Sequence, residues 1–207
     1  PPGTIITRAP YYDSLRAAFI GRAAHAGIAP EEGISAIAMA SRAVSRMRLG
    51  RIDEETTSNL GKIFGGSGRN TVPERVELEG EVRSLSPARI EAQVRHLCRA
   101  MEEAAREAGG KVEIQVRREY DGFAVGTEEP PVKIALAACR AAGLPPLLTS
   151  TNGGSDANEF NARGIQTVVL GMGGSGYHTP QESVAVEELV KLAEWIYALV
   201  VEAGKIP

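Results

Sequence analysis

The sequence predicts a mixed α/β (α+β) fold, in which a ferredoxin-like β-α-β-β-α-β module over residues 13–122 is inserted into a second α/β domain. Two observations lead to this prediction. Strand and helix patterns follow one another in that order up to residue 122, and after Pro130-Pro131 the chain changes to alternating short helices and strands. The pieces 1–12 and 123–207 are then expected to form the second domain together.

The first half of the module is expected to contain a strand, a helix and another strand. Residues 15–24 alternate between apolar and other side chains, as in a strand. Apolar residues at helical spacing predict a helix over 34–48, which Gly50 ends. The second strand is expected over residues 56–64.

The second half repeats the pattern in the order strand, helix, strand. Residues 76–83 alternate between apolar and charged side chains, which is typical of a strand with one buried and one solvated face. Ser86 is a suitable N-cap and Pro87 a suitable first residue for a helix that ends at Gly109-Gly110. Alternation over 112–120 predicts the last strand. The exposed edges of such a sheet favour pairing with a second copy.

The second domain is expected to have three strands, which are few for an independent parallel sheet. Its expected elements are strands over 3–9, 147–151 and 166–170 and helices over 131–142, 156–162 and 186–201. The chain also begins directly with a strand and without a start methionine. We therefore expect it to be part of a longer protein.

Composition excludes several classes of protein. Hydrophobic residues make up 43% and charged residues 24%, with a net charge of −3 and no basic block, so nothing indicates a nucleic-acid partner. No apolar run is long enough to span a membrane. The two cysteines, Cys98 and Cys139, lie in apolar helical patterns without Cys-x-x-Cys spacing, which favours a reducing, cytoplasmic location.

Two of the three histidines lie in the predicted module. His96 falls between core positions of the long helix, so we interpret it as a solvated helix residue without a functional role. His25 follows a strand and precedes Gly27, where little covers the imidazole. It is either a turn residue that bonds a nearby carbonyl, or a donor that a loop presents to an anion or a polarised carbonyl.

The third histidine, His178, lies in the glycine-rich segment 171–179 after the strand expected over 166–170. Ligands collect at the carboxyl ends of strands in open α/β sheets, and neutral imidazole is a good zinc ligand. His178 is therefore a candidate metal ligand, and the alternative is an incidental histidine in a surface turn.

A second glycine-rich segment, 152–158, also follows a short strand and opens a helix. Backbone amides at a helix start can bind a carboxylate or an oxyanion. Asp156 in this segment can also be only a helix cap. The chain contains no His-x-Asp, His-Glu-x-x-His or Gly-x-Ser-x-Gly motif, and one histidine alone cannot complete a catalytic zinc site.

Taken together, the motifs resemble the dizinc aminopeptidases of the peptidase T-like (tripeptide aminopeptidase) family, which is related to acetylornithine deacetylase and carboxypeptidase G. The resemblance is carried, in order, by GTIITRAPYYD, GRAAHAGIAPEEGISAI, LGRIDEETTSNLGKIFGG, RNTVPERVELEGEVRS, GGSDANEFNARGI and GYHTPQESV. It implies that 13–122 is a lid and dimerisation domain, and that 1–12 and 123–207 are the C-terminal part of a catalytic zinc-peptidase domain.

The resemblance also implies roles for residues of this chain. His25 matches the lid histidine that reaches into the partner subunit's active site and stabilises the oxygen of the tetrahedral intermediate. Asn70 and Arg83 match residues that hold the substrate backbone and its carboxylate. The substrate-side glycine loop corresponds to Gly153, Gly154 and Ser155. His178 matches a zinc ligand, and a pair of zinc ions per complete subunit would activate a bridging water and polarise the scissile carbonyl.

The remaining metal ligands and the general base of the family have no match in this chain. The resemblance therefore implies a zinc-dependent exopeptidase that acts on small peptides as a homodimer, of which this chain alone is inactive and holds zinc weakly or not at all. Two alternatives stay open. One is an N-acyl amino acid deacylase with the same motifs, and the other is a non-catalytic dimerisation or ligand-binding module.

Overall fold

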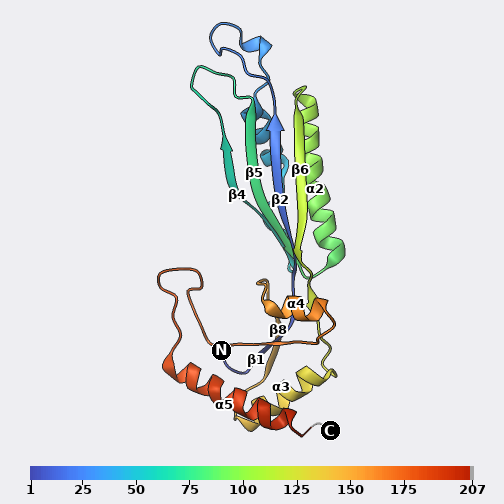
Figure 1. The fold of residues 1–207 in the computed structure, drawn as a ribbon, viewed down its shortest axis with the longest axis vertical. Coiled ribbons are helices and arrows are strands. Elements are labelled where there is room, and N and C mark those ends of the chain that lie inside the picture. Colours follow the sequence, from blue (N-terminus) through green and yellow to red (C-terminus); the bar gives the residue numbers. More distant parts are fainter. Residues whose placement is uncertain (206–207) are drawn as a thin grey trace. The chain divides into compact units, whose positions relative to one another are not determined.

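A five-stranded antiparallel sheet with two helices on one face makes up residues Tyr11–Asp121, one of two compact units in the chain (Figure 1). The other unit consists of Pro1–Pro10 and Gly122–Pro207. The structure is a computed structural model that describes residues 1–205, so the last two residues of the predicted 123–207 piece lie outside the described residues. The mixed α/β fold predicted from the sequence is confirmed.

Strands and helices of the first unit follow the predicted β-α-β-β-α-β order, with one short additional strand. They are β2 (Tyr11–Ile20), the 3-10 helix η1 (Pro30–Glu32), α1 (Ala36–Arg46), β3 (Gly50–Arg51), β4 (Thr56–Gly65), β5 (Arg75–Ser84), α2 (Pro87–Glu107) and β6 (Lys111–Tyr120). The strand order in the sheet is β3-β4-β5-β2-β6. The sequence did not indicate β3, which pairs only with the start of β4.

The first strand lies earlier in the chain than expected. β2 covers Tyr11–Ile20, whereas the sequence predicted a strand over 15–24. The prediction was wrong at both ends. The strand begins earlier because Tyr11 already pairs with Ser84, and it ends earlier because the amides of Gly21 and Arg22 donate to Glu74 and Ile34 instead of to the neighbouring strands. Residues 21–34 therefore form a separate loop beyond the end of the sheet.

Alternation of side chains along the strands produces the core of this unit. Buried residues from β2 and β5, such as Phe19 and Leu78, pack against Met39 of α1 and Leu97 of α2. Ser86 caps α2 as predicted, with its side chain accepting a hydrogen bond from the Arg89 amide at 3.4 Å. Within residues 1–205, no helix packs against the opposite face of the sheet, which carries charged side chains such as Arg16, Glu79 and Arg117.

The second unit contains a small mixed sheet and three helices. Its elements are β1 (Thr4–Ala9), β7 (Phe123–Ala124), α3 (Pro130–Ala141), β8 (Leu147–Ser150), α4 (Asp156–Ala162), β9 (Val169–Leu170) and α5 (Val186–Ala203). β1 pairs in parallel with β8 and antiparallel with β7 and β9. The sheet therefore has four strands where three were expected, and the strand predicted over 166–170 is only two residues long.

Two helices of the second unit pack around a buried tryptophan. Trp195 of α5 is fully buried, and its ring N–H donates to the carbonyl oxygen of Ala135 in α3 at 3.3 Å. The other side of α5 is exposed and apolar, and it includes Tyr197 and Val200. Within residues 1–205, no helix is both long and apolar enough to cross a membrane.

Candidate functional site

His25 lies in a tight turn in the loop that follows β2. The carbonyl oxygen of His25 accepts hydrogen bonds from the amides of Ile28 and Ala29, at 3.2 and 3.1 Å. The His25 ring is exposed, and its Nδ1 accepts a hydrogen bond from the amide of Gly27 at 3.2 Å. Since Nδ1 is an acceptor, the proton of the neutral ring is on Nε2, which can donate to a ligand.

Asn70 lies beside this turn, although many residues separate the two in sequence. The Ala26 amide donates to the Asn70 carbonyl oxygen at 2.9 Å, and His25 forms a β-bridge with Thr71. Asn70 is exposed. The structure thus brings two of the residues singled out in the sequence, His25 and Asn70, to the same end of the sheet. We call this end, residues 21–34 and 66–74, the tip.

Arg83 lies at the opposite end of the same sheet. Along β5, the backbone from Arg75 to Arg83 covers about 26 Å, at roughly 3.3 Å per residue. Arg83 is directly paired with Tyr12 of β2, and Tyr12 in turn is paired with Tyr120 of β6. We call this end of the sheet, with residues Tyr12, Glu81, Arg83 and Tyr120, the base.

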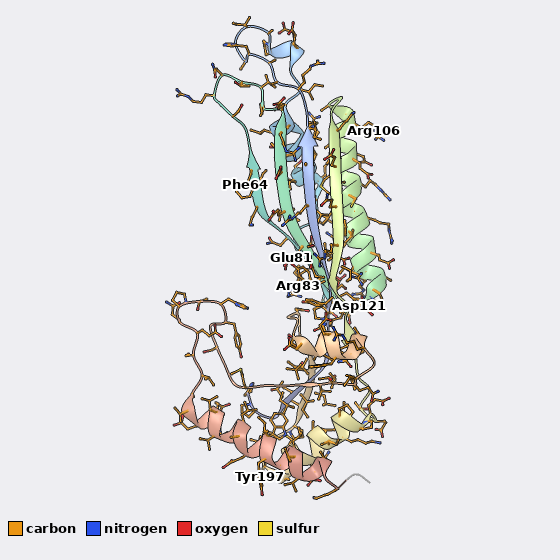
Figure 2. The ribbon with its side chains drawn as sticks, in the orientation of Figure 1. Phe64, Glu81, Arg83, Arg106, Asp121 and Tyr197 are labelled. Atoms are coloured by element: carbon orange, nitrogen blue, oxygen red, sulfur yellow. The ribbon has the colours of Figure 1, made fainter. Side chains whose placement is uncertain are left out.

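The guanidinium of Arg83 is held on several sides. Its Nε and Nη2 donate to the Glu81 carboxylate at 3.0 and 3.1 Å, and its Nη1 donates to the Tyr120 hydroxyl at 3.4 Å. Its carbon Cζ lies 4.5 Å from the centre of the Tyr12 ring. Figure 2 shows Glu81 and Arg83 at the end of the sheet nearest Asp121.

Electrostatics at the base favour charged Arg83 and neutral tyrosines. Burial alone lowers the pKa of Arg83, but hydrogen bonds and the charge of Glu81 outweigh burial and raise it. Burial, with the negative charge of Glu81, raises the pKa of Tyr12. Burial also raises the pKa of Tyr120 against the opposing effect of Arg83. The base therefore presents a charged guanidinium that is paired with the Glu81 carboxylate and lies beside neutral tyrosine hydroxyl groups.

The family resemblance pointed to Arg83, but neither it nor the residue patterns pointed to Tyr12, Glu81 or Tyr120. One local signal was available, because Glu81 and Arg83 are two residues apart in a strand and so share a face. The tyrosines gave no such signal, because their position beside Arg83 depends on the register of β2 and β6.

In the other unit, His178 has a left-handed backbone conformation, with φ of 63°. It is the one non-glycine residue with positive φ among residues 1–205. The loop that holds it is closed by a β-bridge between Ser175 and Ser183, and the His178 amide donates to the Glu182 carboxylate at 3.1 Å. Strained backbone of this kind is concentrated at functional sites, which favours a role for the exposed His178 ring.

The His178 loop follows the carboxyl end of β9, as the sequence suggested, but β9 is not a parallel strand. β9 runs antiparallel to β1, with Leu170 paired to Ile5, whereas β8 runs parallel to β1 and ends where Ser150 pairs with Arg8. The loop after β9 and the loop after β8 therefore leave the sheet at opposite ends of β1. The rule that ligands collect at the carboxyl ends of parallel strands therefore does not support His178, because the direction of a two-residue strand depends on its partner.

The loop after β8 contains Gly153, Gly154 and Ser155. The Gly153 amide donates to the Thr151 hydroxyl at 3.0 Å, and the Ser155 amide donates to the Asn158 side chain at 3.1 Å. Ser155, and not Asp156, is the N-cap of α4. Two of the three loop amides are thus engaged locally, which leaves less of the loop for an anion than the sequence suggested.

The residues of this chain do not by themselves fit a catalytic zinc ion. Within residues 1–205, no group of three or more His, Cys, Asp or Glu side chains could hold a metal. The carboxylate nearest to His178 in sequence, Glu182, already accepts the His178 amide. A catalytic zinc needs about three protein ligands, so His178 can supply only part of such a site.

Comparison with known proteins identifies the first unit. Residues 12–110 match the family described as the peptidase dimerisation domain of M20 peptidases. The protein YqjE of Bacillus subtilis (strain 168) is 46% identical over 203 residues, which cover 98% of this chain and 55% of YqjE. Proteins named peptidase T also match at lower identity.

Solved structures of peptidases match this chain over nearly its whole length. A tripeptidase from Staphylococcus aureus and the aminopeptidase PepT from Bacillus cereus are each 41% identical, with TM-scores of 0.93 and 0.89. Each match covers 99% of this chain and 55% of the other. A dinuclear metal binding peptidase of the M20 family from Bacillus subtilis shares the fold, with a TM-score of 0.73 and 21% identity over 98% of this chain and 54% of its own. The chain thus spans about half the length of the relatives it matches.

Proposed function

Since this chain is a relative of the peptidase T-like M20 peptidases and carries their dimerisation domain over residues 12–110, we propose that it is the lid and part of the catalytic domain of a zinc-dependent exopeptidase that removes N-terminal residues from small peptides. In this proposal, residues 13–122 are the lid, and 1–12 and 123–207 belong to the catalytic domain. The activity is proposed for a longer protein, and the 207-residue chain alone is inactive.

The observation that carries the proposal is the separation of His25 and Asn70 at the tip from Arg83 at the base. About 26 Å of hydrogen-bonded strand lies between the two ends, so one copy of the sheet cannot bring all three to a small peptide. A site that uses them must take the tip from one copy and the base from another. This supports a homodimer in which each lid completes the site of its partner.

Each residue has a chemical role in this arrangement. The Nε2–H of His25 would donate to the oxygen of the tetrahedral intermediate, in the tautomer that the Gly27 amide favours. The amide side chain of Asn70 would hold the substrate backbone. Arg83 would bind the substrate carboxylate, because a planar guanidinium can form paired hydrogen bonds with it.

In the catalytic unit, His178 is proposed as one zinc ligand, with the remaining ligands outside this chain. Bound zinc would supply Lewis-acid polarisation of the carbonyl and an activated water. The chain's own contribution is to hold the His178 backbone through Glu182 and the bridge between Ser175 and Ser183. The amide of Gly154 and the hydroxyl of Ser155 are proposed to contact the substrate.

The second half of β4 supports pairing of two lids. β3 pairs only with Thr57 and Ser58, so β4 from residue 61 onward is an edge of the sheet. Ile63 and Phe64 on this edge are 58% and 59% exposed, and the side chain of Ile37 lies close to the loop that follows it. An edge with exposed apolar side chains is suited to association with another copy.

The test is complementation between two inactive variants of the longer protein, His25→Ala and Arg83→Ala. If His25 acts in the partner's site, a mixed dimer has one site with both residues and one with neither. An equal, freely exchanged mixture should then recover about a quarter of wild-type activity, because about half of the dimers are mixed. Each variant alone should remain inactive.

The control is a mixture of His25→Ala and Asn70→Ala. Both residues lie at the tip, so a mixed dimer contains no site with both and should recover nothing. If the first mixture also recovers no activity although subunits exchange, the shared-site arrangement is wrong.

One alternative substrate class fits the same observation. An N-acyl amino acid also offers a carboxylate to Arg83, so a deacylase would use the base in the same way. Comparing tripeptides with N-acyl amino acids as substrates of the longer protein separates the two, because only the peptides carry a free amine. A purely non-catalytic dimerisation module would show neither activity, and His178→Ala would not change its zinc content.

A further inference from the structure

We infer that Glu81 determines specificity at the base: by occupying one edge of the Arg83 guanidinium, it restricts the site to ligands with a single carboxylate at the bound end. This inference rests on the proposed function, in which Arg83 meets the substrate carboxylate. It adds a substrate class, namely peptides whose C-terminal side chain is not acidic.

The arrangement around Arg83 is built from three neighbouring strands. Tyr12, Arg83 and Tyr120 form a row across β2, β5 and β6, and the two tyrosine rings meet edge to face with centres 5.2 Å apart. Arg83 stacks on Tyr12, while Glu81 holds it from the side. Rotation of the guanidinium would break several of these contacts together, so its direction is fixed before a ligand arrives.

The hydrogen bonds leave a defined set of donors. Nε of an arginine carries one N–H, and each terminal nitrogen carries a pair. Glu81 takes the N–H of Nε and one from Nη2, and Tyr120 takes one from Nη1. One N–H on each terminal nitrogen is left. In this inference Tyr120 takes the Nη1 N–H on the side of Cδ, so the two that are left form one fork, at the end of the guanidinium, for one carboxylate.

Charge adds to this geometric restriction. The Glu81 carboxylate cancels the charge of Arg83, so the pair attracts a first carboxylate only through its directed N–H groups. A second carboxylate on the same ligand would find no unpaired cation at Arg83 and would be repelled by Glu81. At a few ångströms in a partly solvated site, such repulsion changes affinity about threefold to tenfold.

The same strand contains a matched pair without these features. Arg75 and Glu77 have the same spacing as Glu81 and Arg83, and Arg75 Nε donates to Glu77 at 2.8 Å. Their side chains are both 54% exposed, compared with 27% for Arg83 and 34% for Glu81. Variants of Glu77 therefore control for the general effect of removing an acid from this strand.

The test on the 207-residue chain uses N-acetylglycine and N-acetylglutamate as probes with one and two carboxylates. NMR would follow the side-chain nitrogens of Arg83, assigned with Arg83→Lys, at constant ionic strength. In the wild type, N-acetylglycine should shift the Nη signals and leave Nε unchanged, and N-acetylglutamate should bind more weakly. In Glu81→Gln, the preference should move toward N-acetylglutamate by about threefold to tenfold.

The preference between the two probes, compared among the variants, shows whether Glu81 sets it. A preference that is the same in Glu81→Gln and wild type overturns it, as does a wild-type Nε signal that moves with the probe, because Glu81 would then be displaced by the ligand. Glu77→Gln should leave the preference unchanged. An equal change in Glu77→Gln would mean that the overall charge of the sheet, and not the contact with Arg83, sets the preference.

Kinetics of the longer protein give a second readout. Glu81→Gln should raise kcat/KM for peptides ending in glutamate relative to peptides ending in glycine, mainly through KM. If the longer protein hydrolyses no peptide, the proposed function fails while the probe measurements on the chain still decide the role of Glu81. If it hydrolyses peptides but Glu81→Gln leaves this ratio unchanged, the inference alone fails.

Discussion

Glu81 accepts hydrogen bonds from two different nitrogens of Arg83, so the carboxylate lies against one edge of the guanidinium on the open face of the sheet. A bidentate pair of this kind fixes the plane of the guanidinium as well as its position. Arg75 and Glu77, near the other end of the same strand, share a single hydrogen bond from Arg75 Nε and are more exposed. Both ends of the strand therefore carry an Arg–Glu pair, but only the pair at the base is held in a fixed orientation by several contacts.

This difference predicts unequal effects on stability. Arg83→Ala should lower the free energy of unfolding by about 1 kcal/mol, because it removes a partly exposed ion pair and the stacking on Tyr12. Arg75→Ala should have an effect close to zero. Urea unfolding followed by circular dichroism measures both. Equal effects would mean that the contacts at the base do not order Arg83.

The edge of β4 predicts how the chain associates. Ile63→Lys should weaken self-association measured by sedimentation, because a charge on an exposed strand edge opposes pairing with another copy. Val116→Lys is the matched control, since Val116 is exposed on β6 at the other edge of the sheet. If Val116→Lys produces monomers and Ile63→Lys does not, the two lids meet through β6, and pairing through the β4 edge is contradicted.

His96 is not the simple solvated residue that the sequence suggested. Its Nε2 accepts a hydrogen bond from the Arg48 amide at 3.1 Å, so it holds the segment after α1 against α2. The prediction failed because the donor, the Arg48 amide, lies 48 residues away in the chain. The helical pattern around His96 could not show that contact.

The environment of His96 predicts a dependence of stability on pH. Burial, assisted by the charges of Arg48 and Arg99, holds the pKa of His96 below its ordinary value. Stability from the neutral ring is therefore fully present above the ordinary pKa of about 6.5 and is lost as pH falls through the lowered pKa. Unfolding by urea at a series of pH values should show this loss, and His96→Gln should reduce it. His25→Gln, at the exposed tip, should retain it.

Local signals predicted much of the fold. The alternation over 76–83 and the cap at Ser86-Pro87 depend on neighbouring residues, and the structure has a strand and a helix there. The short strands β3, β7 and β9 each have two residues, and the pairing of β7 and β9 is set by β1, which is distant in the chain. No local pattern distinguishes such segments from loops.

The candidate site was predictable to a similar degree. His25 and His178 could be selected because glycines surround them, but the contact of the His25 turn with Asn70 depends on how two loops meet beyond the sheet. The row of Tyr12, Arg83 and Tyr120 depends on the register of three strands. Register is set by the whole hydrophobic pattern of a sheet, so single residues do not reveal it.

Trp195 gives a prediction for the second unit. Trp195→Ala should lower the free energy of unfolding of this unit by about 3–5 kcal/mol, because it leaves a large cavity between α3 and α5. Tyr197→Ala on the same helix should change it by less than about 0.5 kcal/mol, because Tyr197 is 74% exposed (Figure 2). Circular dichroism during urea unfolding measures both variants. Similar losses would contradict the packing of α5 described above.

The backbone of His178 predicts that this residue reduces stability. At φ of 63°, a side chain with a Cβ atom costs about 1 kcal/mol, and glycine avoids this cost. His178→Gly should therefore be more stable than His178→Ala, by about 1 kcal/mol less the added entropy of glycine in the unfolded chain. Both variants lack the imidazole, so the difference between them isolates the backbone. Urea unfolding of the two variants measures it, and an alanine variant more stable than the glycine variant by about the entropy cost of glycine, roughly 0.5–1 kcal/mol, would mean that the turn is unstrained. In the longer protein, both variants should lose zinc equally, because the metal needs the ring and not the conformation.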